Sequence, residues 1–146
     1  MKTVNSMNLK FLSRSCNEAF ARCAVAGFLL SLDPLIEEMN DIKTAVSEAV
    51  TNAIVHGYKD TIGFIYISVS VKEDRKVVIK IKDKGCGIPD IEKAMEPLFT
   101  TGGEERSGLG FSVMDSVMDK IKVTSKKGKY TTVTMERRFS SKGEQS

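Results

Sequence analysis

Glu48 and Asn52 are two polar residues four positions apart, in a stretch whose apolar residues recur every three or four positions. On a helix, side chains with this spacing lie one above the other on one face. A carboxylate there could polarise a hydroxyl group or a water, and a carboxamide oxygen could ligate Mg²⁺. His56, the only histidine, lies four residues further on and extends this face. The alternatives are a solvated helix flank for the pair and a buried, hydrogen-bonded role for the histidine.

The second candidate is the run Asp83-Lys84-Gly85-Cys86-Gly87, which directly follows a stretch of alternating apolar residues. Two glycines would permit the close approach of a flat ligand. An aspartate at the end of a strand could accept a hydrogen bond from an exocyclic amine such as that of adenine. Because Lys82 and Lys84 flank Asp83, we expect them to lower its pKa and to favour the charged acceptor. The alternative is a tight turn in which Asp83 is a local cap.

The third candidate is the glycine-rich stretch 102–110, in which Arg106 precedes the run Ser107-Gly108-Leu109-Gly110. Small residues that lead into a helix expose backbone N–H groups, which bind phosphate well. Arg106 could reach a terminal phosphate, whereas the alternative is a flexible loop with a glycine at the helix entry. Thr131 and Thr132 form a fourth pattern, which alone is uninformative because threonine is common in strands.

Three helices are expected to position these residues. Ser15-Cys16-Asn17-Glu18 has a capping-box pattern and predicts the start of the first helix, and Asp33-Pro34 predicts the start of the second. Gly57 is expected to end the second helix in the left-handed conformation. A third long helix should start beside Gly108-Leu109-Gly110. The buried face of the first helix is predicted to be Phe20, Cys23, Ala24, Gly27 and Phe28, and that of the second Ile42, Val46, Ala49, Val50 and Ala53.

Alternating apolar residues predict strands over 64–71 and 77–82, joined by a turn at 73–75, and a last hairpin around 121–123 and 133–135. Residues 91–95 predict a short helix. Helices followed by hairpins favour an α+β fold, a two-layer sandwich in which helices cover one face of a mostly antiparallel sheet. Residues 137–146 contain one apolar residue and are expected to form a polar tail after a single domain over 1–136.

The composition excludes several classes of protein. The chain has 146 residues, a length that suits one domain. Its formal net charge of +3 is too small to indicate direct nucleic-acid binding. Its three cysteines are an odd number without C-x-x-C spacing, so they indicate neither a disulfide framework nor a zinc site. No apolar run approaches the roughly 18 residues of a membrane helix. The first ten residues also lack a signal-peptide core, so we expect a cytoplasmic protein.

Several common catalytic motifs are absent from the sequence. It contains no G-x-x-x-x-G-K-[ST] P-loop, no G-x-G-x-x-G, no G-x-S-x-G and no H-E-x-x-H. A single histidine also argues against a Ser-His-Asp triad.

The order of the motifs is more specific than any one of them. An E-x-x-x-N on a helix, a D-x-G-x-G after a strand, an S-G-L-G before a helix and threonines on a strand follow one another over 33–136. This order resembles the ATPase fold shared by gyrase, heat-shock chaperones, histidine kinases and mismatch-repair proteins. Residues 43–58, 97–101 and 105–111 look like the anti-sigma factor serine kinases of spore-forming bacteria, of the sporulation anti-sigma F type. Residues 17–22 and 32–34 extend the likeness.

The resemblance implies an ATP-dependent kinase that phosphorylates a serine of an anti-anti-sigma factor and also holds a sporulation sigma factor, sigma F, inactive. Glu48 would be the general base, Arg106 would offset charge on the transferring phosphoryl group, and Asn52 would bind Mg²⁺. Arg22 would contact a partner protein, and the protein would be a homodimer. Residues 97–107 would form a lid. The residues implied for ATP binding are Asn52, Asp83, Gly85, Gly87, Thr100, Thr101, Ser107, Gly108, Leu109, Gly110 and either or both of Thr131 and Thr132.

Three alternatives remain open. A general-stress anti-sigma kinase would share nearly all of these motifs. A detached ATP-binding domain of a histidine kinase would need a phospho-accepting histidine elsewhere, and a non-catalytic ATP-sensing module would not need Glu48. The sequence also departs from the superfamily at Tyr130, because a glycine often precedes the strand threonine there.

Overall fold

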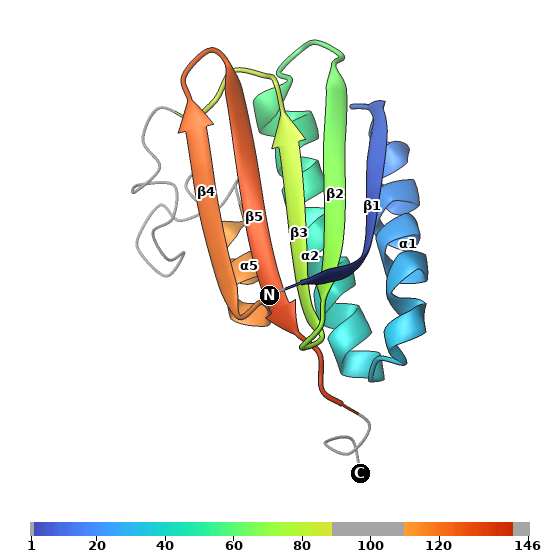
Figure 1. The fold of residues 1–146 in the computed structure, drawn as a ribbon. Coiled ribbons are helices and arrows are strands. Elements are labelled where there is room, and N and C mark those ends of the chain that lie inside the picture. The colour runs from blue at the N-terminus through green and yellow to red at the C-terminus, as the bar shows by residue number, and fades with distance from the viewer. Residues whose placement is uncertain (1, 89–109, 142–146) are drawn as a thin grey trace.

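The computed structural model describes residues 2–88 and 110–141, which form two layers (Figure 1). One layer is a five-stranded sheet with the strand order β1-β2-β3-β5-β4, in which every neighbouring pair is antiparallel. The helices α1, α2 and α5 cover one face of this sheet, which confirms the predicted α+β sandwich (Figure 1). The elements are β1 (Thr3–Leu12), α1 (Asn17–Leu29), a 3-10 turn (Leu30–Leu32), α2 (Ile36–Asn52), a π-helical turn (Ala53–Gly57), β2 (Phe64–Lys72), β3 (Lys76–Asp83), α5 (Phe111–Val117), β4 (Lys120–Lys126) and β5 (Tyr130–Arg138).

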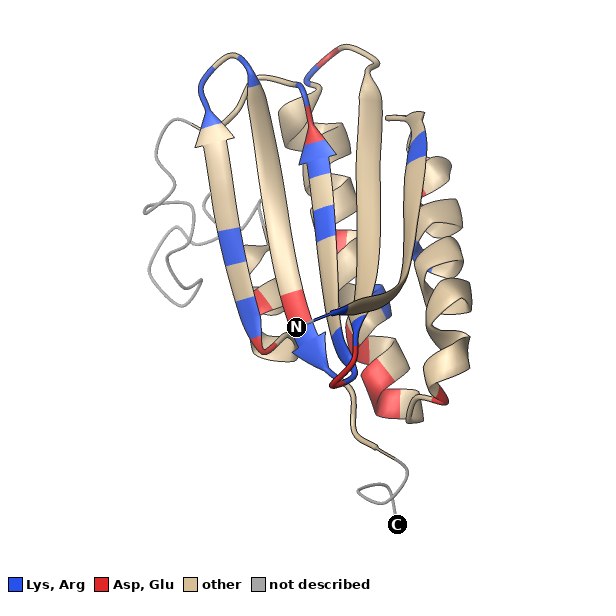
Figure 2. Ribbon diagram, in the orientation of Figure 1, with Lys and Arg blue, Asp and Glu red and all other residues tan. Residues whose placement is uncertain are grey.

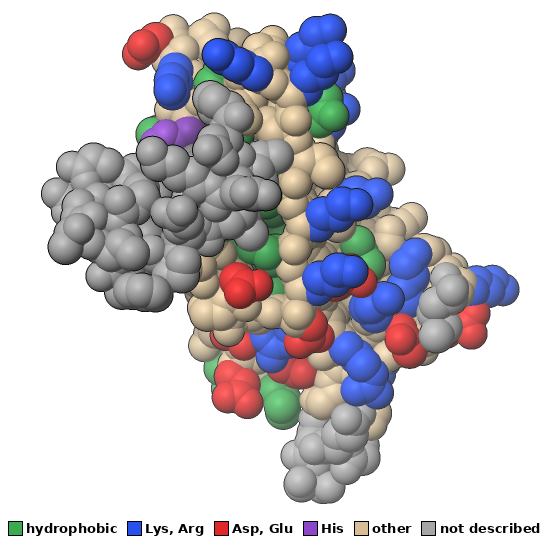
Figure 3. Space-filling model, turned by 90° about the vertical axis from the view of Figure 1, so that its left-hand side faces the viewer, with side chains coloured by type: hydrophobic (Ala, Val, Ile, Leu, Met, Phe, Trp, Pro, Cys, Tyr) green, Lys and Arg blue, Asp and Glu red, His purple; other side chains and the backbone are tan. Residues whose placement is uncertain are grey.

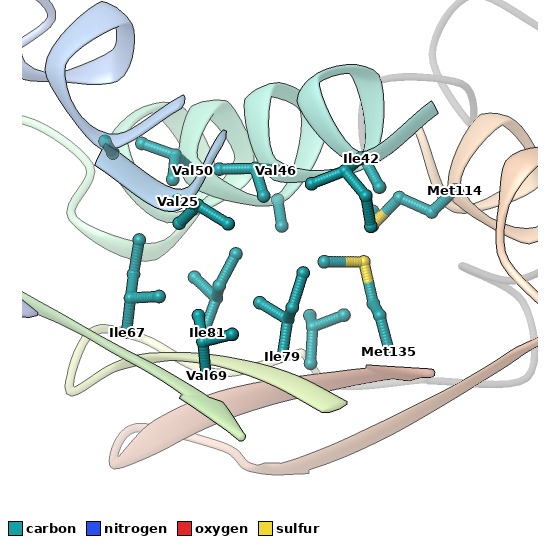
Figure 4. Close-up of a cluster of buried hydrophobic side chains, with 14 of the residues drawn as sticks. Val25, Ile42, Val46, Val50, Ile67, Val69, Ile79, Ile81, Met114 and Met135 are labelled. Atoms are coloured by element: carbon teal, nitrogen blue, oxygen red, sulfur yellow. The ribbon is translucent and has the colours of Figure 1, made fainter. Parts of the chain in front are cut away.

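The core lies between α2 and the sheet. Side chains from α1 and α2 point toward side chains from β2 and β3, and Met114 of α5 meets Met135 of β5 (Figure 4). The strands alternate between buried and partly exposed residues, as their sequence pattern predicts. The predicted apolar stripe of α2 is confirmed, because all five of its members are buried: Ile42, Val46, Ala49, Val50 and Ala53.

The sequence patterns missed the strand β1. It pairs with β2 in register, with Leu9 opposite Ile67, but only one of its residues is buried. An edge strand of this kind has a weak apolar pattern, because one side of its backbone and most of its side chains remain in solvent. Its conformation therefore depends on β2, which supplies the hydrogen bonds.

The helix α1 buries a different face from the one predicted. The buried residues are Ala21, Val25, Ala26 and Leu29, whereas Phe20 is 51% exposed and Cys23 is also exposed. The predicted capping box is wrong as well, because the N-cap is Cys16 and no side chain caps the helix there. Small and branched side chains allow α1 to pack closely on α2, so the larger Phe20 lies at the rim, edge-on to the ring of Phe11.

The helix α2 begins at Ile36 rather than at Asp33-Pro34. Asp33 has a left-handed backbone and ends the preceding 3-10 turn, while the N-cap of α2 is Leu35. The buried Glu38 reaches back and accepts a hydrogen bond from the backbone N–H of Leu35 at 2.9 Å. Acidic residues thus lie at the positive end of the helix dipole, where their charge is stabilised (Figure 2).

The predicted role of Gly57 is also wrong. The α-helix ends at Asn52, and a π-helical turn follows it from Ala53 to Gly57. The φ of Gly57 is not positive. A Cβ at Gly57 would lie 2.7 Å from the carboxylate of Asp83. Glycine is therefore needed here for the close approach of β3 to the end of α2, and not for a left-handed turn.

The predicted polar tail begins too early in the chain. The strand β5 continues through Arg138, and Phe139 is fully buried. Ser140 then donates its backbone N–H to the carboxylate of Glu38 at 2.9 Å, and Arg137 pairs with Asp41. Residues 137–141 therefore belong to the folded sandwich, and residues 142–146 lie outside the part of the chain that the structure describes.

Replacing Phe139 with alanine is expected to lower the free energy of unfolding by about 3–5 kcal/mol, the usual cost of removing a fully buried phenyl ring. Urea unfolding monitored by circular dichroism would measure the loss. The matched control is Phe20→Ala, because that ring is 51% exposed and its removal should cost less than about 1 kcal/mol. Equal losses for the two variants would mean that the segment after β5 is not packed as described.

Candidate functional site

The end of β3 and the start of β5 bring two polar side chains together beneath α2. Asp83 lies directly opposite Thr131 in the ladder between these strands. Both residues are buried, with 5% and 7% of their surface exposed, and side chains opposite one another in such a ladder have Cβ atoms roughly 4.5–5.5 Å apart. Asn52, also buried, ends the α-helix above them.

These residues line one pocket between α2, the π-helical turn and the sheet. The pocket is narrow, and its lining is Ala49, Asn52, Ala53, His56, Gly57, Ile81, Asp83, Gly87, Ile88, Phe111, Thr131 and Val133. Its volume of about 30 Å³ leaves room for a water molecule. Asn52, Asp83, Gly87 and Thr131 were all predicted as site residues, and the tertiary structure brings them together.

Close backbone contacts hold the loop after β3 against the end of the second helix. The N–H of Cys86 donates to the carbonyl oxygen of Gly57 at 2.9 Å, and the N–H of Gly85 donates to Oδ1 of Asp83 at 2.9 Å. A Cβ on Gly85 would overlap this same carbonyl group of Gly57. Gly87 has a φ of +72°, and a Cβ there would overlap the backbone of Lys126 at the end of β4. Packing therefore requires glycine at both positions of the motif, and at Gly87 the backbone conformation requires it as well.

Tyr58 also positions this loop, although the sequence patterns did not single it out. Its hydroxyl donates to the carbonyl oxygen of Phe64 at 2.5 Å and accepts the N–H of Lys84 at 2.8 Å. Burial raises the pKa of this hydroxyl above 10.0. Tyr58 thus joins the start of β2 to the residue that follows Asp83.

Burial raises the pKa of Asp83 from 3.8 to about 6, and the hydrogen bond from Gly85 opposes the shift. The expectation that Lys82 and Lys84 lower this pKa is wrong. Their ammonium groups lie over aromatic rings, that of Lys82 5.4 Å from the centre of Tyr130 and that of Lys84 4.9 Å from the centre of Tyr66. Desolvation of the carboxylate therefore dominates.

Glu48 lies beside the start of α5. Gly110 is the N-cap of this helix, and its φ of +59° suits glycine. A Cβ at Gly110 would overlap Oε2 of Glu48, so the carboxylate lies directly against this backbone. The helix has seven residues and is not the long helix predicted, because Met118 is already extended and β4 begins at Lys120.

Thr131 and Thr132 lie on opposite faces of the sheet. Thr131 faces the pocket, whereas Thr132 lines a shallow depression on the open face with Lys10, Tyr66 and Lys82. Assigning Thr132 to the same site as Asp83 is therefore wrong. The alternation of Thr131 with the buried Val133 and Met135 carried this information in the sequence, because successive residues of a strand point to opposite faces.

Arg22 lies outside the pocket lining, on α1. Its Nε is 3.2 Å from Oε2 of Glu18, one helical turn earlier, and its side chain is 39% exposed. The other predicted site residues, Thr100, Thr101, Arg106, Ser107, Gly108 and Leu109, lie outside the described residues, as does the predicted helix over 91–95.

Positive charge gathers on the open face of the sheet and not in the pocket. Lysines lie at the end of β3 and in the β4–β5 turn (Figure 2). Lys82 lines the depression on the open face, and the lysines of β4 share the exposed side of that strand, on the side of the molecule that Figure 3 presents. Within the described residues, no group of three or more His, Cys, Asp and Glu side chains could hold a metal ion. No helix of that part of the chain has both the length and the apolar character needed to cross a membrane.

Solved structures share this fold. The RsbU and RsbW domains of Rv1364c from Mycobacterium tuberculosis superpose with a TM-score of 0.67 at 15% identity, over 93% of this chain and 33% of that one. The SiaB–SiaC complex from Pseudomonas aeruginosa gives a TM-score of 0.62 at 12% identity, over 92% of this chain and 89% of that one.

Sequence comparisons identify the family. The profile of the histidine kinase-like ATPase domain matches residues 16–137. The anti-sigma F factor of Clostridium acetobutylicum is 56% identical over 136 residues, which are 92% of this chain and 94% of that protein. The anti-sigma F factor of Clostridium beijerinckii is 53% identical over 137 residues, which are 92% and 95% of the two chains. The chain therefore belongs to the histidine kinase-like ATPase domain family and, within it, to the anti-sigma F factors.

Proposed function

We propose that this protein is an ATP-dependent serine kinase and anti-sigma factor of the cytoplasm. It holds a sporulation sigma factor inactive and phosphorylates a serine of the matching anti-anti-sigma factor. The observation that carries the proposal is the pocket in which Asp83, Thr131 and Asn52 meet, with Glu48 beside it at Gly110. The membership of the chain among the anti-sigma F factors supports the choice of partners.

The pocket has the donor and acceptor chemistry that adenine requires. Asp83 offers a carboxylate that accepts hydrogen bonds from the exocyclic amine, and Thr131 supports it from the neighbouring strand. A Cβ at Gly57 would overlap the Asp83 carboxylate, and a Cβ at Gly85 or Gly87 would overlap neighbouring backbone. Glycine at these positions therefore keeps this end of the pocket clear. The family resemblance implies that the backbone N–H groups of Gly108 and Gly110 bind the phosphates, together with Thr100, Thr101, Ser107 and Leu109.

Glu48 is the proposed general base. It orients the serine hydroxyl and takes its proton as that oxygen bonds to the γ-phosphorus of ATP. The bond from the γ-phosphorus to the β,γ-bridging oxygen breaks and ADP leaves, while Arg106 offsets the negative charge of the transferring group. Asn52 would hold Mg²⁺ through its carboxamide oxygen, since Mg²⁺ prefers oxygen ligands and is completed by phosphate oxygens and water. When bound, the ion would offset the charge of the phosphates.

The partner surface is proposed to include Arg22. Its guanidinium is partly exposed and already pairs with Glu18, so a carboxylate of a partner could exchange with that of Glu18 at small cost. The protein is proposed to act as a homodimer, on the basis of its family likeness.

One incubation tests this function. The protein is mixed with Mg-ATP and a candidate anti-anti-sigma protein, and the phosphorylated residue is mapped by mass spectrometry. Acid-stable phosphoserine on the partner is the expected result. Acid-labile phosphohistidine would identify a histidine kinase domain instead, and tight ATP binding without transfer would identify a non-catalytic module. Pull-down of sporulation and general-stress sigma factors in the presence of ATP then distinguishes the two anti-sigma classes.

A further inference from the structure

Ser125, which no sequence motif includes, lies in one row with the two polar residues of the pocket. The ladder between β4 and β5 places Ser125 directly opposite Thr131, and the ladder between β3 and β5 places Thr131 directly opposite Asp83. The three side chains therefore form a row across three adjacent strands, on the face that the helices cover. Ser125 is half-buried at the edge strand, on the same side as Ile121 and Val123.

The hydrogen bonds of Ser125 determine which way its proton points. Its Oγ accepts the N–H of Ile88 at 2.7 Å, donates to the carbonyl oxygen of Tyr130 at 2.8 Å, and lies 3.0 Å from Oγ1 of Thr131. A hydroxyl has one proton, and a carbonyl oxygen can only accept. Because the proton of Ser125 is used on Tyr130, the proton between the two hydroxyls comes from Thr131.

The consequence is a pocket wall that accepts hydrogen bonds. With its proton directed at Ser125, Oγ1 of Thr131 can offer only lone pairs to a ligand or to a bridging water. The carboxylate of Asp83, beside it in the row, is an acceptor as well. Two adjacent acceptors match an exocyclic amine, which has two N–H groups. A purine ring without the amine has no donor at this position and forms no hydrogen bond with them.

We propose that Ser125 is a positioning residue that determines base specificity: by holding the hydroxyl of Thr131 as an acceptor, it favours purines with an amine at C6. This inference rests on the proposed function of the pocket as the adenine site. Ser125 touches neither base nor phosphate itself. Ser125 acts by orienting Thr131. Removing the Ser125 hydroxyl should therefore reduce the affinity that the C6 amine contributes and should not change the affinity for the rest of the nucleotide.

The test compares ATP with purine riboside 5′-triphosphate, which lacks only the C6 amine. Equilibrium affinities are measured for the wild type and for the variants Ser125→Ala and Ser125→Thr. The wild type should prefer ATP, and Ser125→Ala should reduce that preference about five-fold, the effect of one misdirected hydrogen bond. Ser125→Thr keeps the hydroxyl and should retain the wild-type preference for ATP. Thr124→Ala, on the exposed face of the same strand, is the matched control and should leave it unchanged.

A double-mutant cycle with Thr131→Val tests whether Ser125 acts through Thr131. In that background, Ser125→Ala should change the ATP preference no further. The preference is a ratio within one protein, so partial unfolding of a variant lowers both affinities and leaves the ratio intact.

The outcomes separate this inference from the function on which it rests. A wild type that binds neither nucleotide overturns both. A wild type that prefers ATP, combined with a Ser125→Ala variant that loses both affinities equally, leaves the adenine site standing and overturns the inference, because Ser125 would then only anchor the backbone of Ile88. An unchanged preference in Ser125→Ala overturns it as well.

Discussion

Replacement of Glu48 by glutamine is expected to lower serine phosphorylation at least about 100-fold, because a positioned general base contributes roughly 10²–10⁴-fold to proton transfer. Glutamine keeps the shape of the side chain beside Gly110 but cannot take the proton of the serine. Single-turnover transfer of phosphate to the anti-anti-sigma protein, at saturating Mg-ATP, measures the effect on the chemical step.

Two controls make the result specific for Glu48. ATP affinity should stay within about three-fold of the wild type, since removing a base does not remove the adenine contacts. Glu37→Gln changes an exposed glutamate in the first turn of the same helix and should leave transfer unaffected. If Glu48→Gln transfers phosphate within a factor of about ten of the wild type, another group takes the proton.

The substitution Asp83→Asn should weaken ATP binding about 10- to 100-fold, because hydrogen bonds to charged groups contribute about 1.5–3 kcal/mol. The carboxamide has nearly the same shape as the carboxylate, but it presents one acceptor in place of two and adds a donor to the pocket wall. Isothermal titration with ATP measures the loss. Asp60→Asn, in the exposed turn before β2, is the matched control, and an unchanged affinity in Asp83→Asn would exclude Asp83 from adenine recognition.

The pH dependence gives a second test of the same carboxylate. Its pKa is raised to about 6, and the ionised form is the acceptor for the amine, so ATP affinity of the wild type should fall as the pH drops below 6. The stability of the protein without nucleotide should change in the opposite sense. Between pH 3.8 and about 6 the folded chain holds more protons at Asp83 than the unfolded chain, so this contribution to stability is lost as the pH rises.

Asp83→Asn should therefore be at least as stable as the wild type at pH 7, which excludes unfolding as the cause of weak binding. The variant should also lose the dependence of ATP affinity on pH near 6. A wild type whose affinity is flat between pH 5 and pH 7 would contradict the buried, titrating carboxylate described here.

Several elements of the fold could be predicted from local patterns. The stripe of α2 and the alternation of β2, β3 and β5 each recur within one segment, because a buried helix face or strand face requires that spacing. The D-x-G-x-G motif likewise lies where a strand ends. The patterns failed where an element depends on a neighbour: β1 is an edge strand defined by its pairing with β2, and the buried face of α1 depends on α2.

The order of the motifs along the chain was sufficient to identify the ATPase family and to select Glu48, Asn52 and Asp83. These are local properties, since a helix places residues four apart on one face and a glycine-rich turn follows directly from the strand before it. The raised pKa of Asp83, the need for glycine at position 57, and the row from Asp83 through Thr131 to Ser125 could not be predicted in this way. Each depends on burial or on the register between segments far apart in the chain, and both arise only when the sheet and the helices pack together.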